Sequence, residues 1–209
     1  MKILRPSESG MDKAIMHLRQ LLGNAEIIAY ATETFYGLGV NYNQEEALER
    51  LYHIKQRPPD RAMPLIIGRT GLLTLLTPGL SPAAEKLIKE FWPGPLTLIL
   101  KARKHLSLNI TAGTGKVAVR IPGPSFALDL ARHLDYPITA TSANMTGMPP
   151  AETAVQVMDY FGNAAITIVD SGRTPGNAPS TIVDVTGAEV AIVRQGVISA
   201  KAILSVTQR

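Results

Sequence analysis

Cysteine is missing from the 209-residue sequence altogether. Its absence excludes disulfide bonds, thiolate nucleophiles and cysteine-ligated zinc, and it fits a reducing compartment. Aromatic residues make up 5% of the chain and form no clustered stripe, which disfavours a surface that stacks unpaired RNA bases. No apolar run reaches the roughly 18 residues of a membrane span, and the N-terminal residues lack the apolar stretch of a secretory signal. We therefore expect a cytoplasmic protein with no membrane segment.

Several familiar catalytic motifs are missing as well. The sequence contains no HExxH zinc motif, no G-x-S-x-G nucleophile turn and no G-x-G-x-x-G after a strand. The segment 113–116 (GTGK) is similar to the end of a phosphate-binding loop, but Ile110 stands where that loop needs its first glycine. Val117 then follows the lysine in place of Ser or Thr. Zinc proteases, α/β-hydrolases and P-loop enzymes are therefore disfavoured, and we predict no metal-ligating side chains.

The composition that remains is typical of a globular α/β protein. Hydrophobic residues make up 45% of the chain and charged residues 18%, so a substantial core is expected. The length fits one domain over residues 1–209 more readily than two small ones. The formal charge of +4 is a mild excess that favours anionic partners such as nucleotides, phosphate or RNA. Many cytosolic proteins are equally basic without binding nucleic acid.

Hydrophobic periodicity predicts helices alternating with strands. Helices are expected over 11–22, 44–54, 81–91, 125–134 and 153–161 and from about 199, and strands over 26–30, 64–67, 96–100, 117–122, 137–141, 166–170, 181–185 and 191–194. Asn43 and Ser81 are the expected caps of the second and third helices. Because some neighbouring strands are too close for crossover helices, we predict an α/β fold with a twisted mixed sheet and flanking helices. The longest loop is 171–179.

The segment 31–39, ATETFYGLG, is the most distinctive part of the chain. It follows a strand-like run and brings hydroxyls, a carboxylate and two glycines into nine positions. Open α/β sheets place their sites at such strand ends, and glycine lets a backbone approach a ligand closely or adopt positive φ. An ordinary loop with turn glycines explains this segment equally well when it is taken alone.

Polar or cationic side chains recur at the ends of the predicted elements. They are Thr32, Thr34, Lys55, Arg57, Arg120, Ser142, Asn144, Ser180 and Arg194. Each has an ordinary explanation taken singly, such as a solvated helix end, a surface ion pair or a cap. Facing one cleft, they would offer four cations, several hydroxyls and an amide to a substrate that carries phosphates and a carboxylate. None is a nucleophile beside a base, so the set favours phosphoryl or nucleotidyl transfer by positioning and charge stabilisation.

Seven segments follow one another between about Ile27 and Gly196: TETFYGLG, KQRPPD before PLII, WPGPLTLIL, VAVRIPG, ITATSANMTG, STIVDV and VRQG. In this order they resemble the YrdC-type threonylcarbamoyl-AMP synthase family. The resemblance implies a twisted sheet around a deep basic cavity, in the short, single-domain form of the family. It also implies that L-threonine, bicarbonate and ATP give threonylcarbamoyl-AMP and pyrophosphate. That product feeds the N6-threonylcarbamoyladenosine modification of tRNA, with tRNA and the downstream transfer proteins as possible partners.

Site roles follow from the resemblance where the motifs match. Thr34 is implied to hold threonine, and Arg120, Ser142 and Ser180 to bind its carboxylate, amine or carbamate. Lys55 and Arg57 are implied to face the ATP phosphates as the catalytic cations, and Asn144 and Arg194 to contact the nucleotide. Mg²⁺ is expected with ATP. No acidic metal cage is visible in these motifs, with Glu33 as the carboxylate of the first of them, which fits a hydrated ion held mostly by phosphates.

The sequence departs from the family pattern at Ala31, in place of a usual proline, around Met63, and at Gly68, where many relatives carry a histidine. These departures keep open a paralogue of the same fold with another carbamoyl or acyl substrate. A non-catalytic module that binds double-stranded RNA or tRNA is the other alternative. Such a module would show steep salt dependence and no ATP turnover.

Overall fold

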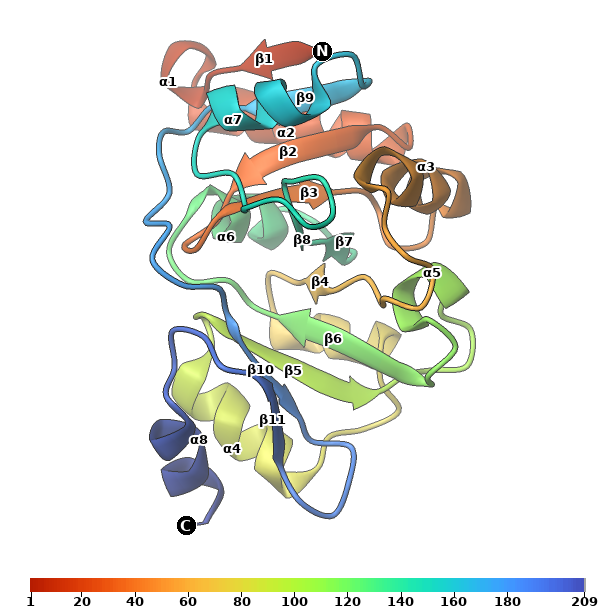
Figure 1. Cartoon of the computed structure of the whole chain (residues 1–209), viewed down its shortest axis with the longest axis vertical. Coiled ribbons are helices and arrows are strands. Elements are labelled where there is room, and N and C mark those ends of the chain that lie inside the picture. The colour runs from red at the N-terminus through yellow and green to blue at the C-terminus, as the bar shows by residue number, and fades with distance from the viewer. Residues whose placement is uncertain (209) are drawn as a thin grey trace.

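Two mixed β-sheets form the frame of the computed structural model, which describes residues 1–208 (Figure 1). Within that range the upper sheet has the order β1 (Lys2–Leu4), β9 (Ile166–Val169), β2 (Ile27–Ala31), β3 (Tyr36–Gly39) and β8 (Thr141–Ser142). The lower sheet has the order β11 (Ala191–Arg194), β10 (Thr181–Asp184), β5 (Leu96–Lys101), β6 (Lys116–Arg120), β4 (Leu65–Ile66) and β7 (Ile138–Thr139). Each sheet contains parallel and antiparallel pairs, which confirms the mixed α/β fold.

The predicted sheet is thus divided into two, and the division lies where β3 meets β7. The residues after β3 still pair with β7, through a bridge between Asn41 and Ile138 and a bond from Thr139 N to Val40 O of 3.0 Å. This short pairing joins the two sheets edge to edge. The frame is therefore one strongly twisted surface with a break in its hydrogen-bond ladder.

Helices cover the sheets from several sides. They are α1 (Pro6–Ser9), α2 (Met11–Gly23), α3 (Glu45–Lys55), the 3₁₀ helix η1 (Thr70–Leu75), α4 (Pro82–Phe91), α5 (Leu108–Thr111), α6 (Phe126–Arg132), α7 (Ala154–Phe161) and α8 (Ala200–Thr207). Buried residues of α2 and α6 pack with Ile28 and Tyr30 of β2, on one face of the upper sheet. Helices α3 and α7 contribute to the larger core cluster, and α4 and α8 pack together beside the lower sheet (Figure 1).

Strand alternation gives the lower sheet two different faces. Leu98 of β5 is fully buried and is paired with Val119 and Val183 on the neighbouring strands. The next residue along the strand, Ile99, is paired with Ala118 and points to the opposite face, which looks into a cavity. Half of the side chains of this sheet therefore belong to the core and half to the cavity.

Side-chain caps mark the starts of four helices within residues 1–208, namely α4, α5, α7 and α8. Ser81 Oγ accepts a hydrogen bond from Ala84 N at 3.2 Å, as expected for the cap of α4. The prediction for Asn43 was wrong, because α3 begins after Gln44, whose side chain makes no capping bond. Asn43 instead donates its backbone N–H to Asn41 Oδ1 at 3.4 Å.

Tyr36–Gly39 forms a strand, although its glycines suggested a loop. A Cβ atom at Gly39 would lie 2.6 Å from a ring carbon of Tyr30 on the paired strand β2. The glycine is therefore needed for close packing against a buried aromatic ring, and not for positive φ.

Candidate active site

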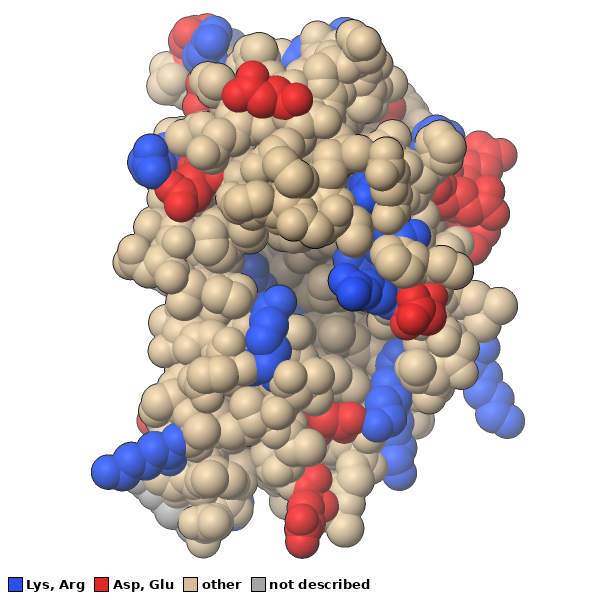
Figure 2. Space-filling model, viewed as in Figure 1, with Lys and Arg blue, Asp and Glu red and all other residues tan. Residues whose placement is uncertain are grey.

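A cavity of about 330 Å³ lies between the two sheets. Its walls come from the turn after β2, the cavity-side residues of β5, β6 and β10, the end of β11, and the segment around β8. The space-filling view shows this face hollowed at its centre, with basic side chains on both sides of the hollow (Figure 2). A concave site with convergent polar groups is the usual form of a small-molecule site.

Six of the eight predicted site residues line this cavity. They are Thr34, Arg57, Arg120, Ser142, Ser180 and Arg194. The fold thus brings together side chains that lie far apart in the chain, such as Thr34 and Arg194, which are separated by 160 positions. Lys55 and Asn144 are not among the lining residues and lie in the wall behind Ser142.

The turn after β2 is shaped by the hydroxyl of Thr32. Its Oγ1 accepts the backbone N–H groups of Thr34 (3.1 Å) and Phe35 (3.2 Å) and donates to Phe35 O at 2.7 Å. The Thr34 hydroxyl lies 3.0 Å from Thr32 Oγ1, and either oxygen can be the donor in that contact. Thr34 also lines the cavity, so its Oγ1 can accept a hydrogen bond from a ligand there, such as an amine.

Arg120 is the last residue of β6 and forms a buried ion pair with Glu33. Its Nη1 donates to Glu33 Oε1 at 2.5 Å, and the two side chains are 8% and 12% exposed. The rest of the guanidinium makes no hydrogen bond within residues 1–208, and Arg120 lines the cavity. Unused donors on a buried guanidinium suit an oxyanion.

Arg194 and Ser180 form a second polar wall at the ends of β11 and β10. The Arg194 guanidinium donates to Ser180 O through Nε (3.2 Å) and Nη2 (2.8 Å), and to Ser180 Oγ at 3.1 Å. Ser180 Oγ also lies 2.9 Å from Thr97 Oγ1. Burial, and secondarily the charge of Arg120, lowers the pKa of Arg194, so two cations share this side of the cavity.

Arg57 follows α3 and is held by neutral groups. Its Nε donates to Arg61 O at 3.0 Å and its Nη2 to Ala62 O at 2.6 Å, and its Nη1 lies 3.4 Å from Thr141 Oγ1. Burial lowers the pKa of Arg57 from its ordinary value. No carboxylate pairs with Arg57 in the described part of the chain, which leaves its charge available to an anion.

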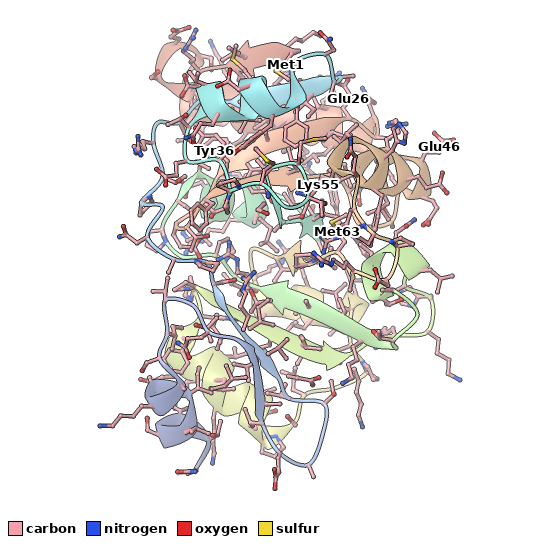
Figure 3. All side chains as sticks on the ribbon, in the orientation of Figure 1. Met1, Glu26, Tyr36, Glu46, Lys55 and Met63 are labelled. Atoms are coloured by element: carbon pink, nitrogen blue, oxygen red, sulfur yellow. The ribbon has the colours of Figure 1, made fainter. Side chains whose placement is uncertain are left out.

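Lys55 supports the cavity wall from behind. It is 2% exposed and donates its Nζ to the carbonyls of Ser142 and Asn144, the latter at 2.9 Å. Burial, and then the charge of Arg57, lowers the pKa of Lys55 to about 7. Figure 3 shows Lys55 at the end of α3, on the upper side of the space between the sheets.

Asn144 shapes the segment that Lys55 holds. Its Oδ1 accepts from Ser142 Oγ at 2.6 Å, and its Nδ2 donates to Met145 O at 3.0 Å and Met148 O at 2.5 Å. The amide is therefore occupied within its own loop. In this structure Asn144 orients Ser142 and does not face the cavity.

The departures from the family pattern lie outside the cavity wall. Ala31 and Met63 belong to the hydrophobic core. A Cβ atom at Gly68 would lie 2.2 Å from the backbone oxygen of Ala131, so this position packs against α6 and cannot carry a histidine. The cavity-lining residues of this region are Ala62, Pro64 and Leu65, which sequence reasoning missed.

Other cavity residues were also missed, notably Thr97 and Thr141. Thr97 lies in a strand that was correctly predicted and alternates there with Leu98. Which of the two side chains faces the cavity depends on how this strand pairs with β10. The GTGK segment stays outside the cavity, as its poor match to a phosphate loop indicated. Its Lys116 pairs with Asp184 at 2.7 Å.

The loop 171–179 is bonded to the turn beside the cavity. Gly176 N donates to Thr34 O at 3.0 Å, and Tyr36 Oη donates to Gly172 O at 2.7 Å. Its last residue, Pro179, lines the cavity. This loop therefore ties the upper sheet to the start of β10.

A metal ion would find few protein ligands here. Among residues 1–208 no group of three or more His, Asp or Glu side chains is placed to hold one. Glu33 is engaged by Arg120. In the same range, no helix has the length and apolar character to cross a membrane.

Comparisons with known proteins show the family to which the chain belongs. The profile of the Sua5/YciO/YrdC family, described as "Telomere recombination", matches residues 20–196. The chain is 37% identical over 82% of its length to the threonylcarbamoyl-AMP synthase of Pyrococcus abyssi, and 36% identical over 93% of its length to that of Bacillus subtilis. The chain therefore belongs to the Sua5/YciO/YrdC family.

The structural match extends over nearly the whole chain. The crystal structure of P. abyssi Sua5 complexed with L-threonine superposes with a TM-score of 0.91 at 34% identity, over 98% of this chain and 60% of that one. The chain spans 50% and 57% of the lengths of the P. abyssi and B. subtilis relatives. The shared region is thus the domain described here.

Proposed function

We propose that this protein is an L-threonylcarbamoyladenylate synthase, a nucleotidyltransferase acting on L-threonine, bicarbonate and ATP. The observation that carries the proposal is one cavity lined by three arginines together with the hydroxyls of Thr34, Ser142 and Ser180. Two of the arginines have no carboxylate partner in the described range, as a polyphosphate site requires. The threonine-bound Sua5 structure and the relatives' names support the amino-acid half.

The reaction balances in two steps. The threonine ammonium loses a proton and its amine joins bicarbonate, forming N-carboxythreonine and water. A carbamate oxygen then attacks the α-phosphorus of ATP while the bond to the β-phosphate oxygen breaks, giving threonylcarbamoyl-AMP and pyrophosphate. The protein contributes position and charge, because donors aimed at the phosphate oxygens stabilise the charge that develops there.

The chain's residues divide between the two halves of the substrate set. Thr34 accepts from the threonine amine, and Arg120 binds the carboxylate, with Ser142 and Ser180 beside the carbamate. Arg57 and Arg194 face the phosphates. Lys55 and Asn144 act through the Ser142–Asn144 backbone that they hold.

Mg²⁺ enters this proposal as part of the substrate MgATP. The cavity offers hydroxyls and no lining carboxylate, so the residues fit an ion held by phosphate oxygens and water. The ion would neutralise phosphate charge during the transfer. We further propose a cytoplasmic location, with tRNA and the threonylcarbamoyl-transfer proteins downstream.

The test is pyrophosphate release from MgATP and bicarbonate with and without L-threonine. We expect threonine-dependent release, with serine much weaker. Arg57→Ala should lower kcat/KM for ATP by about 10- to 100-fold, since a buried charge-assisted bond is worth roughly 1.5–3 kcal/mol. Thr34→Val should raise the KM for threonine and leave that for ATP nearly unchanged.

Arg103→Ala is a matched control, because the side chain of that exposed arginine bonds only the Thr74 carbonyl in the described range and does not line the cavity. ATP binding without threonine-dependent release would refute the proposed substrate and favour a paralogue. Salt-sensitive RNA binding with no ATP turnover would favour a binding module.

A further inference from the structure

The ion pair between Glu33 and Arg120 engages only one of the two carboxylate oxygens of Glu33. One carboxylate oxygen accepts one guanidinium N–H, at 2.5 Å. The second oxygen, Glu33 Oε2, is buried and has no hydrogen-bond partner within residues 1–208. A pair that served stability alone would gain from a bidentate arrangement with both oxygens satisfied.

Glu33 is itself held firmly. It lies in the turn fixed by the Thr32 hydroxyl, and its Cγ would be 3.1 Å from a Cβ atom at Gly123. Glu33 does not line the cavity, whereas Arg120 does. The Glu33 carboxylate therefore binds Arg120 Nη1 from outside the cavity. The remaining N–H groups of the Arg120 guanidinium stay available to a ligand in the cavity.

The three cavity arginines differ in their counter-charges. Arg57 and Arg194 bond carbonyl and hydroxyl groups, while Arg120 alone of the three contacts a carboxylate within the described range. A phosphate approaching Arg120 would be repelled by Glu33 at close range in a poorly hydrated wall. An amino acid would bring a carboxylate to Arg120 and an ammonium group to the field of Glu33 and the lone pairs of Thr34.

We propose that Glu33 is a positioning and specificity residue: it orients Arg120 and makes this wall of the cavity selective for a zwitterionic α-amino acid over phosphate. The inference deepens the proposed function and rests on it for the identity of the amino acid. Threonine would thus bind at Arg120, whose charge is partly neutralised by Glu33. The triphosphate of ATP would bind at Arg57 and Arg194, which contact no carboxylate in the described range.

The experiment is isothermal calorimetry of L-threonine and of inorganic pyrophosphate with wild type and Glu33→Gln. Glutamine keeps the length and an acceptor oxygen but removes the charge. We expect threonine to bind at least about tenfold more weakly and pyrophosphate to bind several-fold more tightly, given the strength of charge-assisted bonds. Asp135→Asn is the matched control, because Asp135 also pairs with arginines but is exposed, and neither it nor its partners Arg19 and Arg69 line the cavity.

Loss of the charge next to a buried arginine can unfold a protein, so a second variant is needed. Glu33→Gln with Arg120→Gln removes both charges, and its threonine affinity should equal that of Arg120→Gln alone. Equal weakening of both ligands in Glu33→Gln, or full additivity in the double variant, would overturn the inference.

A ligand-free measurement separates this inference from the proposed function. In ¹⁵N-labelled protein, the Arg120 side-chain resonances should be resolved in wild type and averaged in Glu33→Gln. If wild type binds no threonine, the proposed function fails and the zwitterion preference fails with it. The resonances still decide positioning: identical Arg120 signals in both proteins would refute it.

Discussion

A buried charged side chain can support the cavity wall from behind, at a cost in free energy for keeping its charge. Lys55 is the clearest case, because an ammonium group buried at the end of α3 supports the backbone of Ser142 and Asn144. Burial opposes its charge, and the nearby Arg57 opposes it further. The charged form is therefore less favourable in the folded protein than in the unfolded chain.

The depressed pKa of Lys55 predicts a pH-dependent stability. Between about pH 7 and the ordinary value of 10.5, the unfolded chain binds a proton that the folded protein lacks, so the free energy of unfolding rises with pH. The slope from this group approaches about 1.4 kcal/mol per pH unit. Urea unfolding from pH 7 to about 9.5, below tyrosine ionisation, should show this rise in wild type and not in Lys55→Met. Parallel slopes in the two proteins would contradict it.

The residue scale also shows what sequence reasoning can and cannot supply. Arg120 and Arg194 could be placed because each ends a strand, and strand ends converge on sites. The partner of Arg120 could not be predicted, because Glu33 lies 87 positions away and the contact depends on how two distant segments meet in the fold. The role of Gly68 could not be predicted for the same reason. It packs against the backbone of α6, a contact that no local sequence pattern reveals.

At the scale of elements, the long helices were predictable, whereas strand β3 and the division of the predicted strand 137–141 were not. Ser81 and the Thr153–Gln156 capping box mark helix starts through bonds made within four residues. Strand β3 looked like a loop because its glycines pack on Tyr30, and the predicted strand 137–141 is divided between β7 and β8, which have two residues each. Such strands exist only through their partners, so tertiary pairing decides them.

The end of the 171–179 loop is locked by Gly196, which follows β11. A Cβ atom there would lie 2.2 Å from Pro179 O and 2.5 Å from the carbonyl carbon of Ser180. Gly196 N also donates to Thr181 Oγ1 at 3.0 Å. This contact sets the position of Ser180, and through it the hydrogen bonds of Arg194.

We expect Gly196→Ala to lower the free energy of unfolding by roughly 1–3 kcal/mol, because backbone atoms must shift to admit the methyl group. The same shift should raise the KM for threonine and the KM for ATP, since Ser180 and Arg194 move together. Gly71→Ala is the control: nothing lies within 4 Å of its Cβ position, and its change should stay within about 0.5 kcal/mol. Urea unfolding with pyrophosphate-release kinetics checks both; an unchanged KM in Gly196→Ala would show that Ser180 is held by other contacts.

The whole molecule is organised so that one cavity draws on two sheets. Tyr36 belongs to the upper sheet and Thr34 to the turn that joins two of its strands, whereas Arg120 and Arg194 belong to the lower sheet and Ser180 directly precedes its strand β10. Composition and length predicted one domain but not the break between the sheets, because that break follows from the twist of strands that pair across it. The largest core cluster nevertheless contains Leu38 of the upper sheet together with Leu98 of the lower.

This shared core predicts that residues 1–209 unfold as one cooperative unit. The sole tryptophan, Trp92, donates its indole N–H to Leu96 O at 2.7 Å and reports on the lower sheet, whereas far-ultraviolet circular dichroism reports on both. The two signals should give the same urea midpoint and the same slope. MgATP with threonine should raise both midpoints equally, since a ligand that contacts both sheets stabilises only the state in which both are folded. An earlier Trp92 transition, or a ligand shift confined to one signal, would instead mean that the sheets are separate domains and that the cavity is an interface between them.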